Sequence, residues 1–319
     1  MSKVLKSKIR PLILPILHRW QHFYDFSRGR WREFTLRGAW QDFRDRRTAL
    51  KRATPIIEDS SGIRFVLYPW DRKRLLYLYR HPHDVAEFAA IRRLVKPGDI
   101  AFDVGANIGT YSVLLGGLCG SAGRVWAFEP VPDTYWRLRE TLVLNRSDNV
   151  IPLQRVVCER SGVARVNLFE PKYSEWNTLG NPSMVTERGY CISPSASVDV
   201  PSCTLDDFCG EERIERIHFI KIDVEGFELS VFQGAQRLLR QGLIDCICFE
   251  ISKDPLKGAG IESKAVFDAL AAHGYLAYRF NINMSRFEGP IYDTSEAWTN
   301  FFASRTDLSK THPPLGTKQ

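Results

Sequence analysis

Two acidic residues stand at the ends of apolar runs, each beside a change in the chain's pattern. Asp103 lies in "FDVGANIG", just before Gly105 and Gly109, and Glu129 closes the next apolar run, "RVWAFE". Gly105 can adopt backbone angles that other residues avoid, and N–H groups at the following helix start can bind a carboxylate. A carboxylate at Glu129 can accept hydrogen bonds from both hydroxyls of a ribose. The two acids and the glycine turn therefore predict a nucleoside-binding site.

The spacing within the turn favours one kind of nucleoside. Gly105, Asn107 and Gly109 form GxNxG, whereas dinucleotide-binding proteins carry GxGxxG. An acid directly before the turn would repel a pyrophosphate but suits an amine or another cation. S-adenosylmethionine has a sulfonium, an amino group, a carboxylate and a ribose diol, so it fits better than NAD. The predicted cofactor-binding residues are Asp103, Gly105, Ala106, Asn107, Ile108, Gly109, Glu129 and Pro130. Taken alone, Asp103 could cap the turn and Glu129 could be a solvated strand end.

A second pair of acids follows a later apolar run, in "IKIDVEGFE". Asp223 ends the run and Glu225 follows two residues on, so both side chains can share one face, while Gly226 permits a turn. A methyl group on a sulfonium is already activated, so catalysis needs positioning and, for a neutral hydroxyl acceptor, a base. We predict Asp223 and Glu225 as catalytic residues, with Asp223 the first choice; each could instead cap the next helix. Paired carboxylates could also bind a divalent cation, but no third acidic ligand is obvious beside them, so no metal site is predicted.

The segment 171–200 is expected to shape the acceptor site. It is rich in Pro, Ser, Asn and Gly and shows little periodicity, and an insertion of this length in a compact domain is usually a functional loop. Tyr173 and Trp176 could stack on a sugar ring, and Asn177 could hydrogen-bond its hydroxyls; the alternative is an ordered loop around a buried Trp. Glu250, which ends another apolar run, is a further substrate candidate or else one half of an ion pair.

The elements that must position these residues alternate from residue 100 onward. Strands are expected at 100–104, 124–130, 150–158, 164–169, 217–222, 243–252 and 275–280, and helices at 107–118, 133–145, 204–209, 228–240 and 263–274. Continuous apolar strands separated by helices are typical of a doubly wound, mostly parallel α/β sheet. Ligands of such a sheet bind beyond the carboxyl ends of its strands, which is where Asp103, Glu129 and Asp223 would meet.

The N-terminal part differs from the rest in charge. Residues 1–52 hold 14 Lys and Arg against 4 Asp and Glu, a net charge of +10, while the remaining chain holds 30 against 33, a net charge of −3. Aromatic residues of this arm, for instance Trp20, Phe23 and Tyr24, recur at roughly helical spacing, which predicts a basic helical extension. The expected parts are the arm at 1–52, a hairpin (63–68 with 75–80) and a helix (85–95) within 53–99, and a catalytic domain at 100–310.

The charge distribution also bears on partners and location. A basic arm suits packing on the body or a protein partner, or contact with an anionic membrane surface. The nearly neutral body argues against a nucleic-acid groove. The apolar run 11–17 is far shorter than the ~20 residues of a spanning helix, and the seven scattered cysteines show no zinc or CxxC spacing. We therefore expect a cytoplasmic protein, peripheral at the inner membrane surface if the arm binds lipid.

Several motifs together resemble one known family. "DVGANIGTYS", "AFEPVPDTYWRLRETLVLN", "TLDDF", "IKIDVEGFELSVFQGA" and "CFEIS" are similar to the FkbM-type family of S-adenosylmethionine-dependent methyltransferases, over roughly residues 85–280. The resemblance implies a Rossmann-like class I methyltransferase fold, a seven-stranded sheet whose last strand is antiparallel, and residues 298–304 could supply that strand. It also implies methylation of a hydroxyl, often on a sugar or a polyketide-type product.

The resemblance and the residues lead to one expected function and two alternatives. The expected function is S-adenosylmethionine-dependent O-methylation of a small-molecule acceptor, glycan, glycolipid or related natural product. The first alternative is a non-catalytic nucleoside-binding partner recruited through its basic arm, although such a module would have no physical need for both Asp103 and Glu129. A nicotinamide-dependent oxidoreductase is the weaker alternative.

Overall fold

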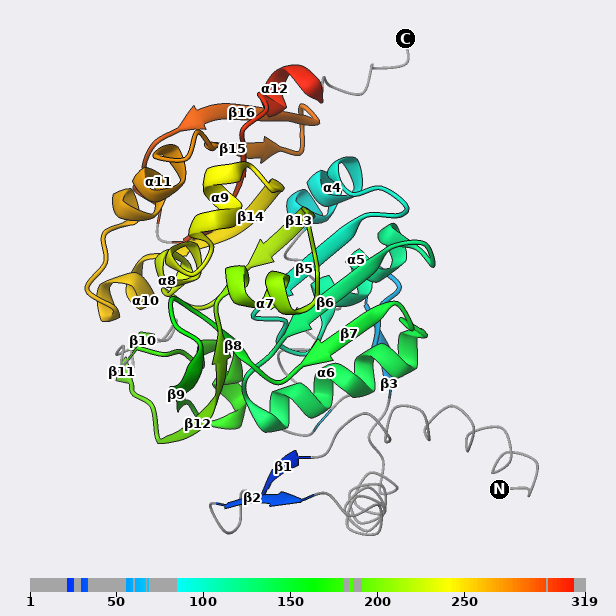
Figure 1. The fold of residues 1–319 in the computed structure, drawn as a ribbon, viewed down its shortest axis with the longest axis vertical. Helices are drawn as coiled ribbons and strands as arrows, with labels where there is room; N and C mark the ends of the chain where they lie inside the picture. Colours follow the sequence, from blue (N-terminus) through cyan, green and yellow to red (C-terminus); the bar gives the residue numbers. More distant parts are fainter. Residues whose placement is uncertain are drawn as a thin grey trace, which may run out of the picture. The chain divides into compact units, whose positions relative to one another are not determined.

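The computed structural model describes residues 22–25, 30–33, 56–59, 61–66, 68, 85–180, 184–185, 191–296 and 298–312 (Figure 1). The chain forms two units, residues 1–55 and 56–319. In the first unit, β1 (His22–Asp25) and β2 (Arg30–Glu33) pair as antiparallel strands. The helix expected through Phe23 and Tyr24 is therefore wrong, because aromatic residues also favour strands and so short a spacing fits both structures. Predictions for the other residues of 1–52 lie outside the described part.

The second unit is built on a mixed sheet that confirms the doubly wound α/β class. Its eight strands are β5 (Ile100–Val104), β6 (Arg124–Phe128), β7 (Val150–Leu153), β13 (Ile217–Ile222), β14 (Ile244–Ser252), β15 (Leu276–Asn281), β16 (Arg286–Ile291) and β17 (Trp298–Ser304). Their order across the sheet is β16-β15-β17-β14-β13-β5-β6-β7. The strands from β14 to β7 are parallel. Strand order reverses between β5 and β13, so their carboxyl ends mark the crevice where ligands of such sheets bind.

The far edge of the sheet differs from the expected count of seven strands. β17 pairs antiparallel with β14, as predicted for 298–304. The extra strand is β16, which pairs antiparallel with β15 on the outer edge of the sheet. Its sequence "RFEGPI" has a weak apolar pattern and includes Pro290, which removes a backbone donor and suits an edge position. This local hairpin therefore adds one strand without changing the order of the others.

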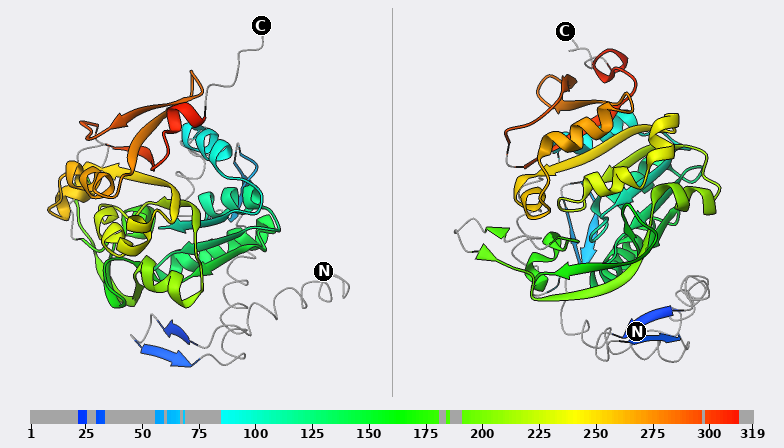
Figure 2. Two further views of the ribbon diagram at one scale, coloured as in Figure 1. Left: turned by 45° about the horizontal axis from the view of Figure 1, so that its top comes forward. Right: turned by 60° about the vertical axis from the view of Figure 1, so that its left-hand side comes forward.

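Helices cover both faces of the sheet (Figures 1 and 2). One face packs on α4 (Val85–Leu94), α5 (Thr110–Cys119) and α6 (Pro132–Asn145); the other packs on α7 (Leu205–Glu211), α8 (Glu228–Gln233), α9 (Gln236–Gln241) and α11 (Ser263–Ala271). Figure 1 shows α7, α8 and α9 in front of the sheet. The helix expected at 228–240 is divided at Gly234, where a Cβ would lie 2.2 Å from the carbonyl oxygen of Cys158. Burial on both faces explains why the parallel strands are continuous apolar runs.

The region after β7 forms a second, smaller sheet. The run 150–158 is divided into β7 and β8 (Val156–Val157), and β8 pairs with β12 (Ala196–Cys203), which also pairs antiparallel with β9 (Gly162–Leu168). The strand predicted at 164–169 therefore lies outside the main sheet. Between β9 and β12 lie the short helix η1 (Pro171–Trp176), β10 (Met184–Val185) and β11 (Cys191–Ile192). The predicted insertion thus lies between the paired strands β9 and β12.

Further elements complete the second unit: α10 (Lys253–Gly258), α12 (Leu308–Thr311), and the paired strands β3 (Ile56–Glu58) and β4 (Arg64–Val66). The strand predicted within 63–68 is present, but its partner is 56–58, and residues 75–80 lie outside the described part. The Arg64 N–H donates to Asn145 Oδ1 at 2.9 Å, which ties β4 to the end of α6. The helix predicted at 85–95 is confirmed as α4. Within the described residues, no helix has the length and apolar content needed to cross a membrane.

Candidate functional site

A cavity of about 770 Å³ lies at the carboxyl ends of β5, β6, β13 and β14. The predicted site residues that line it are Gly105, Ala106, Asn107, Ile108, Glu129, Pro130, Trp176, Asn177, Asp223, Glu225 and Glu250. Those that do not line it are Asp103, Gly109 and Tyr173. The topology therefore brings the predicted cofactor turn, the catalytic acids and the acceptor loop to one space.

The end of β5 and the end of β13 touch each other at Gly105. The Asp223 N–H donates to the carbonyl oxygen of Val104 at 2.9 Å. Gly105 has φ 83°, and a Cβ at this position would lie 1.8 Å from the Asp223 carbonyl oxygen. Only glycine tolerates both the positive φ and the close approach. The predicted cofactor turn and the predicted catalytic loop are consequently held in direct backbone contact.

Glu129 is held rigidly at the edge of the cavity. Its Oε2 accepts a hydrogen bond from the Asn107 N–H at 3.0 Å, and its Oε1 accepts one from the Val131 N–H at 2.9 Å. Burial raises the pKa of Glu129 to about 7, and these two hydrogen bonds oppose the rise. Each carboxylate oxygen keeps a further lone pair. Glu129 can therefore accept hydrogen bonds from a diol without losing its own anchors.

We call the part of the cavity formed by Gly105, Asn107 and Glu129 the nucleoside corner. An amide oxygen of this corner has no hydrogen-bond partner in the described part of the chain, which also indicates a ligand site. Asn107 lines the cavity, and its Oδ1 is buried without a hydrogen-bond partner among the described residues. A buried acceptor of this kind is costly unless a ligand supplies a donor. Glu129 offers acceptors for a diol and Asn107 offers an acceptor for an N–H group. These donors and acceptors fit S-adenosylmethionine, which carries a ribose diol and an amino group.

Asp103 lies beneath the turn instead of in the cavity wall. Its side chain is 1% exposed, and its carboxylate accepts a hydrogen bond from the Ser112 hydroxyl in α5. Burial raises its pKa to about 6. Side chains alternate along a strand, so Asp103 faces α5 whereas Phe102 and Val104 face the other helix layer. The structure thus places Asp103 as a support for the helix that follows the turn.

Gly109 and Tyr173 also act from outside the cavity wall. A Cβ at Gly109 would lie 2.7 Å from Leu138 Cδ1, so this glycine permits α5 to pack closely on α6. Tyr173 stacks on Trp176 with ring centroids 4.7 Å apart and an interplanar angle of 2°. Trp176 lines the cavity, so Tyr173 stabilises the ring that an acceptor would meet. Asn177 accepts a hydrogen bond from the Phe169 N–H through Oδ1 at 2.9 Å.

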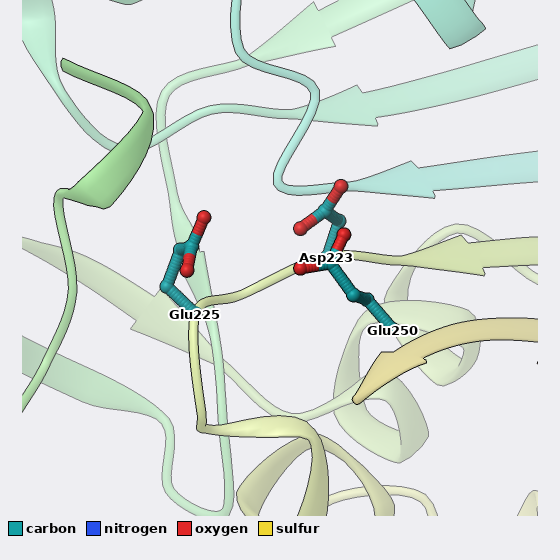
Figure 3. Close-up of side chains that lie close together, drawn as sticks. All are labelled: Asp223, Glu225 and Glu250. Atoms are coloured by element: carbon teal, nitrogen blue, oxygen red, sulfur yellow. The ribbon is translucent and has the colours of Figure 1, made fainter. Parts of the chain in front are cut away.

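Three acidic side chains meet in the cavity beside the Gly105 turn. Asp223 and Glu225 follow β13, and Glu250 projects from the carboxyl-terminal part of β14 (Figure 3). Oxygen atoms of all three carboxylates lie within 4.8 Å of one another. From the sequence we expect no third acidic ligand beside Asp223 and Glu225. That expectation is wrong, because the pairing of β13 with β14 brings Glu250 to them.

The environment of Glu225 and Glu250 favours the protonated forms of these two side chains. Burial and the neighbouring carboxylates raise the pKa of Glu225 well above its usual value, and burial together with Asp223 raises that of Glu250. Glu225 also has φ 51°, a strained conformation for a residue with a side chain, and its carbonyl accepts a hydrogen bond from Thr178 Oγ1 at 2.9 Å. Strain of this kind persists where the surrounding structure holds the residue in place, and it is common at active sites.

Sequence reasoning missed Lys221, which is fully buried within β13. Its Nζ lies 3.2 Å from Asp223 Oδ2 and 5.1 Å from the centre of the Tyr111 ring. Burial alone would lower the pKa of Lys221, but Asp223, Cys248 and Glu250 raise it, so the side chain stays a cation. The detectable signal is a lysine inside the otherwise apolar strand "IHFIKI", because a buried charge requires a partner. The ion pair fixes the orientation of Asp223.

Glu228, the first residue of α8, contacts the loop after β13, and no side-chain hydrogen bond caps α8 at its N-cap Phe227. Its Oε1 accepts hydrogen bonds from the N–H groups of Val224, at 3.4 Å, and Gly226, at 3.3 Å. Burial raises its pKa to about 7. Glu228 therefore holds the loop after β13, and the carboxylates of Asp223 and Glu225 face the cavity.

Comparisons with known proteins agree with these features. The profile of the Methyltransferase FkbM domain matches residues 103–277. The chain is 29% identical over 174 residues to hexuronic acid methyltransferase AglP of Haloferax volcanii, covering 54% of this chain and 62% of that protein. It is 29% identical over 161 residues to 31-O-demethyl-FK506 methyltransferase FkbM of Streptomyces tacrolimicus, covering 44% and 61%. It is 26% identical over 192 residues to 2-O-methyltransferase NoeI of Sinorhizobium fredii, covering 58% and 76%. The match therefore spans less than two thirds of the length of the first two relatives.

Proposed function

The chain belongs to the FkbM methyltransferase family, and from this premise we propose that it is an S-adenosylmethionine-dependent O-methyltransferase. The proposed acceptor is a hydroxyl on a sugar, glycolipid or related natural product. The observation that carries the proposal is the backbone contact between Gly105 and Asp223, since it joins a nucleoside corner to a cluster of carboxylates inside one cavity. The printed names of the relatives, which include a hexuronic acid methyltransferase and a 2-O-methyltransferase, support this acceptor class.

In the proposed complex, the nucleoside corner holds the cofactor. When bound, S-adenosylmethionine would supply an electrophilic methyl carbon: a bond from the acceptor oxygen to this carbon would form as the C–S bond breaks and its electron pair stays on sulfur. Glu129 accepts the two ribose hydroxyls, since its anchored oxygens each retain a lone pair. Asn107 Oδ1, which has no partner among the described residues, accepts an N–H of the cofactor's amino group. Gly105 lets the ligand approach the main chain.

The carboxylates after β13 act on the acceptor. Asp223 is fixed by Lys221 at 3.2 Å and orients the acceptor hydroxyl. Glu225 receives the proton that this hydroxyl loses, because its raised pKa makes the carboxylate a stronger base than an exposed glutamate. Trp176 lines the acceptor side of the cavity, where an aromatic surface suits the C–H face of a sugar.

An anionic membrane surface is the proposed partner of the arm, residues 1–52. The support is the net charge of +10 in this segment, because each basic residue near an anionic surface contributes about 1 kcal/mol. An acceptor carried on a lipid would then be presented where the enzyme accumulates.

The test of the proposed activity is transfer of label from radiolabelled S-adenosylmethionine. The protein is incubated with fractionated lipids, glycans and small metabolites, and the matched control is the Glu129→Ala variant. We expect label in one fraction with the unaltered protein and much less label with the control. Tight binding of S-adenosylhomocysteine without transfer to any fraction would support the non-catalytic alternative, and calorimetric binding of NAD in its place would support an oxidoreductase.

A further inference from the structure

A buried amide from β17 lies beside the carboxylate cluster and has no partner. Asn300 stands directly opposite Glu250 in the antiparallel pairing of β14 with β17. Residues opposite each other in such a pair project from the same face of the sheet with adjacent Cβ atoms. Both residues line the cavity, and each is 6% exposed. Asn300 Oδ1 accepts no hydrogen bond within the described structure, so this oxygen is available to bind a cation.

The charges around the cluster also favour binding of a positive ion. Asp223, Glu225 and Glu250 bring three acidic groups within 4.8 Å, and Figure 3 shows their carboxylates facing a common space. The nearest buried cation, Lys221, contacts Asp223 and is only one positive charge. The strongest charge effects on Glu225 all come from other acids: Glu250, Asp223, Glu228 and Glu175. A further positive charge beside Glu225 and Glu250 would relieve this repulsion.

We propose that Asp223, Glu225, Glu250 and Asn300 bind one divalent cation of the Mg²⁺ or Mn²⁺ type. Three carboxylates and one amide offer only oxygen ligands, which hard divalent cations prefer, whereas zinc favours nitrogen and sulfur. The ligands come from three segments, the loop after β13 and the strands β14 and β17, so the fold holds them in place before the ion arrives. Their common opening toward the cavity leaves coordination positions for water or a ligand.

The role of this ion rests on the proposed function, although its binding does not. A cation at the cluster would bind the oxygen of the acceptor hydroxyl and lower the pKa of that hydroxyl. The Glu225 oxygen that does not coordinate the ion would accept the proton. The ion would also orient neighbouring hydroxyls of a sugar, which adds a means of selecting one position for methylation.

The test measures binding of Mn²⁺ to the full chain in the absence of cofactor. The readout is the decrease in the paramagnetic signal of free Mn²⁺ as the ion binds. We expect one saturable site that Mg²⁺ competes for. Glu250→Gln and Glu225→Gln should each weaken Mn²⁺ binding about tenfold or more. Asn300→Asp, which keeps an oxygen ligand and adds charge, should retain or strengthen it. The half-buried Glu225 keeps the test usable if the Glu250 variant folds poorly.

The matched control separates this proposal from the proposed function. Glu129→Ala removes a carboxylate from the same cavity but outside the cluster, so it should weaken S-adenosylhomocysteine binding and keep Mn²⁺ binding. Glu225→Gln should show the reverse. Absence of saturable Mn²⁺ binding to the unaltered chain would overturn the cation site, as would equal loss of Mn²⁺ in the Glu129 and Glu225 variants. Neither result would alter the evidence from cofactor binding.

Discussion

The Cα of Gly105 and the carbonyl oxygen of Asp223 lie so close that a Cβ on Gly105 would be 1.8 Å from that oxygen. This contact joins the carboxyl ends of β5 and β13, the two strands between which the order of the sheet reverses. It places the proposed methyl donor and the proposed proton acceptor on either side of a single backbone contact. A substitution at either residue should therefore affect both cofactor binding and proton transfer.

Gly105→Ala should disrupt the site and the fold together. The new Cβ would clash with a backbone oxygen, and alanine disfavours φ 83°. We expect a loss of roughly 3 kcal/mol or more in the free energy of unfolding, measured with urea, and loss of cofactor binding. Gly117→Ala is the matched control, because Gly117 is exposed in α5 with nothing near its Cβ position; it should stabilise the chain by about 0.5–1 kcal/mol. Equal stability of the two variants would contradict the close contact.

Glu129→Ala should weaken cofactor binding while the fold persists. The substitution removes the proposed acceptor for the ribose and also the anchor of the Asn107 N–H. Hydrogen bonds to a charged group contribute about 1.5–3 kcal/mol, so the dissociation constant for S-adenosylhomocysteine should rise roughly 10- to 100-fold. Isothermal calorimetry measures the constant, and circular dichroism checks the fold. Unchanged affinity would show that the ribose lies elsewhere.

The residues that sequence reasoning places correctly are those at the ends of parallel strands. Gly105, Glu129 and Asp223 each follow an apolar run, and the carboxyl ends of parallel strands meet at one edge of the sheet. Asp103 is misplaced by that reasoning because it stands one residue before the strand end, and the alternation of side chains turns it toward α5. The period of a strand could have given this orientation from the sequence alone.

The rest of the site depends on pairings that no local pattern records. Glu250 joins Asp223 and Glu225 only through the register of β13 against β14. Asn300 comes from a strand that returns antiparallel some 50 residues later in the chain, opposite Glu250. β16 has a weak apolar pattern, because an edge strand buries less than a central one. Register and edge pairing are set by tertiary packing, so these parts required the structure.

Asp223→Asn should lower turnover more than cofactor affinity. The amide keeps the size of the side chain but cannot carry the charge that pairs with Lys221 at 3.2 Å and orients the acceptor. We expect kcat to fall about 100-fold or more, with little change in S-adenosylhomocysteine binding. Asp254→Asn, at an exposed position in α10, should retain activity. Full turnover in the Asp223 variant would remove this residue from the mechanism.

Removal of residues 1–52 should reduce binding to anionic vesicles and spare cofactor binding. The deletion removes a net charge of +10 from the chain, and electrostatic attraction to phosphatidylserine vesicles falls with each basic residue lost. Co-sedimentation with phosphatidylserine vesicles measures the effect, with neutral phosphatidylcholine vesicles and raised salt as controls. Equal sedimentation of both proteins would reject a lipid role for the arm.

Glu228→Gln should change how stability depends on pH. Glu228 is 1% exposed, and burial raises its pKa from 4.5 to about 7. A carboxyl whose pKa rises on folding binds its proton more strongly in the folded state, so its contribution to stability is complete below about pH 4.5 and is lost as the pH rises through about 7. Glutamine remains neutral and avoids this loss. The variant should therefore gain on the order of 1–3 kcal/mol in the free energy of unfolding, relative to the unaltered chain, between pH 5 and pH 8.

Urea unfolding at pH 5 and at pH 8 measures this difference, and Glu215→Gln, an exposed substitution, should not produce it. Parallel pH dependence in the unaltered chain and the Glu228 variant would mean that the buried carboxyl does not titrate in this range.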